Sequence, residues 1–87
     1  MNQLMEKVYH TTSLALAAWL VYSGVKLRGV LKTRRDNRRV FEFEWQDGLD
    51  QLIESFFKGN ALVNAESYFL VLKSLKSRIY DTEINVE

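Results

Sequence analysis

The alternation of apolar and polar residues predicts a β-hairpin in the middle of the chain. Between positions 25 and 33, one series of alternate positions is Val25, Leu27, Gly29 and Leu31, and the other is Lys26, Arg28, Val30 and Lys32. Between 39 and 45, Phe41 and Phe43 alternate with Glu42 and Glu44. A period of two is typical of strands that are buried on one face only. The residues Asp36-Asn37 between the two segments favour a turn. We therefore expect the segments to pair, with the phenylalanines on the buried face.

Two other segments have the pattern of helices that belong to the core. The run from Leu14 to Tyr22 is apolar on nearly every side and rich in alanine and leucine, which indicates a central helix covered on more than one side. Thr12 or Ser13 is suited to cap its start, and Gly24 to end it. A second helix is predicted after Asp47, which would cap it. Its apolar stripe has the spacing i, i+3, i+4, i+7, i+8 and consists of Leu49, Leu52, Ile53, Phe56 and Phe57.

A third helix is predicted to begin after Asn64, with the asparagine side chain as its cap. Its buried face is formed by Tyr68, Leu72, Leu75 and Ile79. With a short strand at residues 6–11, the order becomes β-α-β-β-α-α. We therefore expect a single α+β domain over residues 1–87, in which a three-stranded sheet with a central hairpin has helices packed on one face. Residues 1–5 and 81–87 are predicted to be frayed ends, and the strand order is left open.

Composition excludes several classes of protein. Of the 87 residues, 47% are hydrophobic and 26% are charged, which is ordinary for a globular domain. The absence of cysteine excludes disulfides and thiolate metal sites. The longest apolar run has nine residues, whereas a membrane span needs about 20. The N-terminal residues do not have the pattern of a secretory signal. We expect a cytoplasmic protein that does not enter a membrane.

Several segments together resemble a known family. These are the run from Thr12 to Leu20, Gly24, the segment Phe41-Glu42-Phe43-Glu44, and the run from Leu75 to Tyr80. They are similar to a family of short bacterial and phage proteins that is a domain of unknown function. The resemblance covers nearly the whole chain and rests mostly on core and cap residues. It implies a protein encoded on phages or other mobile elements, and it implies no mechanism and no catalytic residues.

The residues that usually carry catalysis are sparse. His10 is the single histidine, and no nucleophile or second ligand stands at a useful spacing from it. Glu42 and Glu44 share one strand face, but Lys26, Arg28 and Lys32 are predicted on the same outer face. We therefore interpret these charges as a solvated, self-neutralised surface. The sequence predicts no catalytic residue, no metal site, no cofactor and no enzymatic activity.

Positive charge is concentrated at the turn of the hairpin. Seven of the twelve basic residues lie between positions 26 and 39, although the net charge is only +1. The candidate binding residues are those nearest the turn, namely Lys32, Arg34, Arg35, Arg38 and Arg39. Arginine pairs with carboxylates of a protein as well as with phosphates of a nucleic acid. Charged turns also occur simply because they keep strands soluble, so a turn without function is the third alternative.

We expect a small non-enzymatic protein-interaction module, of the kind that serves as an accessory or inhibitory protein of a phage or mobile element. Eleven aromatic residues are many for so small a core. Those that exceed what such a core easily holds are Trp19, Tyr22, Phe56, Phe57, Tyr68 and Phe69. An exposed patch of some of them would make a protein interface or a homodimer. An unidentified protein partner is preferred over nucleic acid because the net charge is nearly neutral. The alternative is a nucleic-acid-binding accessory protein that contacts phosphates through the arginine-rich turn. A small hydrolase or nuclease is the third alternative.

Overall fold

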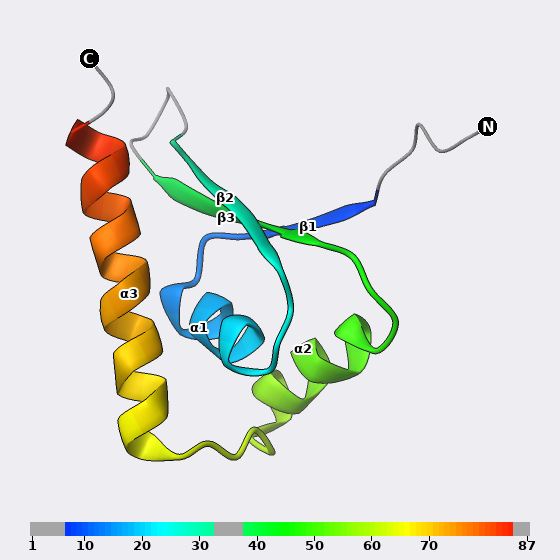
Figure 1. Ribbon diagram of the computed structural model, residues 1–87. Coiled ribbons are helices and arrows are strands. Elements are labelled where there is room, and N and C mark those ends of the chain that lie inside the picture. Colours follow the sequence, from blue (N-terminus) through cyan, green and yellow to red (C-terminus); the bar gives the residue numbers. More distant parts are fainter. Residues whose placement is uncertain (1–6, 33–37, 85–87) are drawn as a thin grey trace.

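The computed structural model confirms the predicted order of elements (Figure 1). It describes residues 7–32 and 38–84, with side chains up to Tyr80. Along the chain, the elements are β1 (Val8–Thr11), α1 (Leu14–Tyr22), β2 (Leu27–Lys32), β3 (Arg39–Glu44), α2 (Leu49–Lys58) and α3 (Ala65–Ile84). The predicted frayed segment 1–5 lies outside the described residues. The molecule is an α+β domain with a three-stranded antiparallel sheet.

The sheet has the order β1-β3-β2, which settles the strand order that the sequence left open. Strand β3 is central and pairs with both neighbours: Phe43 lies opposite Tyr9 of β1 and Leu27 of β2. Phe41 and Phe43 are both buried beneath the sheet, as the alternation predicts. The helices lie on this face, and within the described residues the opposite face carries none (Figure 1).

Helix α1 lies at the centre of the core because almost all of its surface is apolar. Five consecutive residues, Leu16 to Leu20, are buried. The hydroxyl Oγ of Ser13 accepts a hydrogen bond from the Leu16 N–H at 3.0 Å and caps the helix. Gly24 follows the helix with φ of 96°, a left-handed conformation in which glycine has no steric penalty. Both predicted ends of this helix are confirmed.

The start of α2 differs from the prediction. Gly48, with φ of 89°, occupies the capping position, and no side chain caps the helix. The Leu49 N–H instead donates to the Gln46 carbonyl at 3.1 Å, so a backbone turn leads into the helix. The prediction that Asp47 caps α2 is therefore wrong, because the turn places Asp47 one residue before the cap.

Helix α3 begins as predicted but ends later. The Asn64 Oδ1 accepts from the Ser67 N–H at 2.9 Å and caps the start. The helix continues to Ile84, into the segment 81–87 that was predicted to fray, and neither glycine nor proline interrupts it. None of the helices in the described part of the chain is long and apolar enough to cross a membrane.

A bulge in β2 changes which face its residues occupy. The register passes from Leu27 opposite Phe43 to Gly29 opposite Glu42, so one extra residue is accommodated in β2. Such a bulge reverses the alternation beyond it. Leu31 therefore lies on the open face, where it is 45% exposed, while Lys32 falls on the same side as Phe41. The prediction that Lys32 shares the outer face with Glu42 and Glu44 is wrong for this reason.

Candidate functional site

The candidate binding residues lie at the end of the hairpin formed by β2 and β3. Lys32 and Arg39 are partners in the last pair of the register, and Arg38 directly precedes β3. Arg34 and Arg35 lie outside the described residues. The structure thus brings three of the five candidate residues together, and two of them, Lys32 and Arg38, are exposed. Like charges directly opposite each other in a ladder repel, so this pair gives little to the hairpin's stability.

The three basic residues differ in how they meet their surroundings. Arg39 is half-buried, and its Nε atom is shielded from solvent. Arg38 and Arg39 each interact with other groups of the molecule. The exposed ammonium of Lys32 and the exposed side chain of Arg38 give the hairpin end a positively charged surface.

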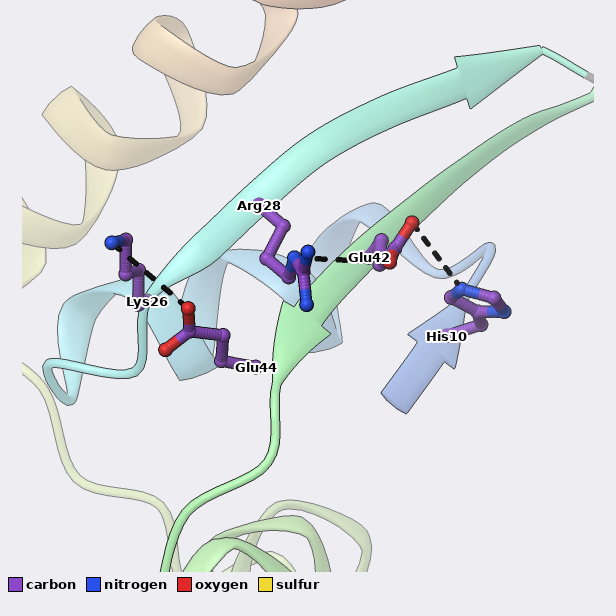
Figure 2. A network of polar contacts seen from close by, with 5 residues as sticks. All are labelled: His10, Lys26, Arg28, Glu42 and Glu44. Carbon is purple, nitrogen blue, oxygen red and sulfur yellow. Dashed lines mark ion pairs between the residues drawn. The ribbon is translucent and has the colours of Figure 1, made fainter. Parts of the chain in front are cut away.

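A network of ion pairs covers the open face of the sheet (Figure 2). Arg28 Nε lies 4.0 Å from Glu42 Oε2, and Lys26 Nζ lies 4.0 Å from Glu44 Oε2. These contacts confirm the predicted self-neutralised surface for Lys26 and Arg28. At these distances and in contact with solvent, each pair contributes little to stability.

His10 has a neighbour that the sequence did not suggest. Its Nε2 atom lies 3.6 Å from Glu42 Oε1, because the register places His10 of β1 directly opposite Glu42 of β3 (Figure 2). The His10 side chain is 49% exposed, and it borders an open hollow that is also lined by Thr12 and Val40. Within the described residues, no three His, Asp or Glu side chains come together to hold a metal ion. The contact between His10 and Glu42 is therefore part of the charge network on the open face.

Three of the aromatic residues that the sequence placed in doubt connect helices by hydrogen bonds at the edge of the core. The Trp19 Nε1–H donates to the Leu52 carbonyl at 2.9 Å, and the Tyr22 hydroxyl accepts from the Asn64 N–H at 2.9 Å. The Tyr68 hydroxyl donates to the Ala15 carbonyl at 2.8 Å, and burial raises the pKa of Tyr68. These hydrogen bonds hold α1 against α2 and against the start of α3.

Other apolar side chains do lie on the surface. Phe57 at the end of α2 is 69% exposed, and Leu62 in the connection to α3 is 85% exposed. On α3, Phe69, Leu70 and Tyr80 are each more than half exposed. Phe57 and Phe69 were among the aromatic residues that the sequence analysis considered for an exposed patch, whereas the exposure of Leu62, Leu70 and Tyr80 was not predicted. The sequence signal for Leu70 and Tyr80 is a second helical stripe on α3, opposite the buried one.

The fold is that of a small α+β domain with helices on one face of its antiparallel sheet. Two different surfaces are exposed on it: the basic end of the hairpin, and the apolar side chains of α2, α3 and their connection. Residues 6–81 match the family DUF5659, which is described as a domain of unknown function. The chain belongs to this family, as its resemblance suggested. No curated protein and no solved structure matches it.

Proposed function

We propose that the chain is a small non-enzymatic protein-interaction module. The observation that carries this proposal is the exposure of large apolar side chains at the end of α2 and in the connection that follows, above all Phe57 and Leu62. Burial of such side chains against another protein removes apolar surface from water, which favours association. The α2–α3 connection lies at the end of the molecule opposite the hairpin end (Figure 1).

The basic hairpin end is the second contact element of the proposal. Exposed Lys32 and Arg38 suit an acidic partner surface. Exposed charges direct the encounter of two proteins more than they add affinity. A cytoplasmic setting and an accessory or inhibitory role on a phage or mobile element belong to the same proposal, and both rest on the sequence.

The proposal is tested by native pull-down with the purified chain as bait, from cells of the natural source. We expect a discrete protein that is retained by the wild type and lost with Leu62→Ser or Phe57→Ser. Because both side chains are mostly exposed, neither substitution removes core packing. Gln51→Ser, an exposed polar position on α2, is the matched control and retains the partner. The proposal is rejected if no protein is retained by both the wild-type bait and the Gln51→Ser bait.

Nucleic-acid binding through the hairpin end is the alternative, favoured by the exposed Lys32 and Arg38. It predicts a gel shift at low salt that weakens steeply as salt rises, because each phosphate contact releases counterions. The double substitution Arg35→Ala with Arg38→Ala would weaken this shift, whereas Leu62→Ser would leave it unchanged. Absence of a shift at low salt excludes the alternative.

A further inference from the structure

Helix α3 has two different faces. One face packs against α1 and β2, with Leu75 buried and Tyr68, Leu72 and Ile79 partly buried around it. The opposite face follows its own helical spacing of i, i+3, i+4, i+7, i+11 and i+14 and consists of Glu66, Phe69, Leu70, Lys73, Ser77 and Tyr80. We call this set the outer face of α3.

The outer face carries three large side chains that are mostly exposed. Phe69 and Leu70 are each 57% exposed and Tyr80 is 63% exposed. Nζ of Lys73 lies 5.6 Å from the centre of the Phe69 ring and covers part of it. A helix with apolar residues on both faces is typically covered on both, so the outer face is suited to a helix of another molecule.

The charges on the outer face indicate which helix fits there. Glu66 precedes Phe69 by three residues, and Lys73 follows Leu70 by three residues. Since a helix rises 1.5 Å per residue, the two charges lie about 5 Å on either side of the midpoint between Phe69 and Leu70. Two copies of α3 that cross in antiparallel fashion at this midpoint would place Glu66 of each copy opposite Lys73 of the other. The arrangement pairs opposite charges twice and brings Phe69 and Leu70 of both copies together.

A centre of the antiparallel pair further along α3 is less favourable. A two-fold axis at Lys73 would place the two lysines opposite each other and leave Leu70 opposite Lys76. Like charges in direct opposition disfavour that register. Of these two centres, the midpoint between Phe69 and Leu70 is the one about which the surface is self-complementary, as an isologous dimer requires.

We propose that the N-terminal half of the outer face of α3, from Glu66 to Lys73, is the interface of a homodimer, in which two α3 helices pack antiparallel about the midpoint between Phe69 and Leu70. This inference rests on the proposed function, since it names a second copy of the chain as one protein partner. The connection residue Leu62 and the hairpin end do not belong to the outer face. The face is short, so we expect a dimer that dissociates at roughly micromolar concentration.

The test measures the mass of the purified full chain by sedimentation velocity over a wide range of concentration. The wild type is expected to pass from monomer to dimer. Glu66→Lys and Lys73→Glu each create two like-charge pairs and should weaken association about tenfold or more. An equal mixture of the two variants should restore association, because both cross-pairs in the mixed dimer again have opposite charge. The double variant Glu66→Lys with Lys73→Glu should restore it as well.

Two controls separate the interface from general effects. Lys76→Glu makes the same charge change on the flank of α3 and should leave the dissociation constant within about twofold of the wild type. Circular dichroism checks folding, because Glu66→Lys also loses a favourable charge in the first turn of α3. Recovery in the mixture cannot arise from a folding defect in either variant.

The outcomes are distinct from those of the pull-down. A concentration-independent monomer overturns the homodimer, while a partner lost with Leu62→Ser still supports the interaction module. A dimer whose strength is unchanged by Glu66→Lys and Lys73→Glu also overturns the proposed interface. Conversely, a dimer with the charge-swap behaviour, together with an empty pull-down, supports the homodimer and rejects the wider proposal of another protein partner.

Discussion

On one side of strand β3, Phe41 and Phe43 are 1% and 0% exposed, whereas on the other side Glu42 and Glu44 remain in contact with water. The same six-residue strand thus supplies the centre of the core and the centre of a charge network. Burial of each phenylalanine removes a large apolar area from water, while the ion pairs are solvated and loosely spaced. Alternation along one strand therefore separates side chains that stabilise the fold from side chains that contribute little to its stability.

The largest expected effect follows from a cavity on the covered side. Phe43→Ala removes a fully buried ring and should lower the free energy of unfolding by about 3–5 kcal/mol. Leu31→Ala, on the open face, should lower it by less than about 1 kcal/mol because Leu31 is nearly half exposed. Urea denaturation of both variants measures the difference. Equal losses would show that the open face is covered in solution, and the contrast between the two faces would fail.

A smaller effect on the free energy of unfolding is expected where α3 packs against α1. Tyr68→Phe removes the hydrogen bond to the Ala15 carbonyl and should cost about 1 kcal/mol of unfolding free energy near neutral pH.

The same residue predicts a dependence on alkaline pH. Because burial raises the pKa of Tyr68 above its usual value, the folded chain holds this proton more tightly than the unfolded chain. The resulting stability is complete below about pH 10, the usual tyrosine pKa, and is lost as pH rises through the higher folded pKa. Urea denaturation at neutral pH and above pH 10 should show this loss in the wild type, and a smaller loss in Tyr68→Phe. An equal loss in both proteins would contradict the assignment.

The sequence predicted the elements because local chemistry and tertiary packing agree there. Alternation identified Phe41 and Phe43 as buried, and uniform apolarity identified α1 as central. Ser13 and Asn64 were recognisable caps because each has a hydroxyl or amide directly before a helix. At the second helix two residues competed for the cap, and backbone conformation at Gly48 decided against Asp47.

The site was harder to predict because it depends on long-range register. A glycine inside a strand, such as Gly29, is a local signal for a bulge. The sequence pattern was nevertheless interpreted as an unbroken alternation, whereas the bulge moves Lys32 to the covered side and Leu31 to the open side. The contact between His10 and Glu42 joins residues far apart in the chain, through a strand pairing that the sequence left open. The sequence of α3 contains two helical stripes with apolar residues. Which of the two is buried is decided by the packing of α3 against α1 and β2, and this packing cannot be seen in the sequence.

The smallest expected effect tests the open face directly. A double-mutant cycle with Glu42→Gln and Arg28→Gln should give a coupling free energy below about 1 kcal/mol, because the pair is solvated and 4.0 Å apart. The coupling should fall further at high salt, which screens exposed charges. Lys26→Gln with Glu44→Gln, a more exposed pair at the same distance, provides the matched cycle. A coupling well above 1 kcal/mol that survives high salt would mean that the open face is desolvated. The second copy would then pack on the sheet, in direct conflict with a dimer formed through α3.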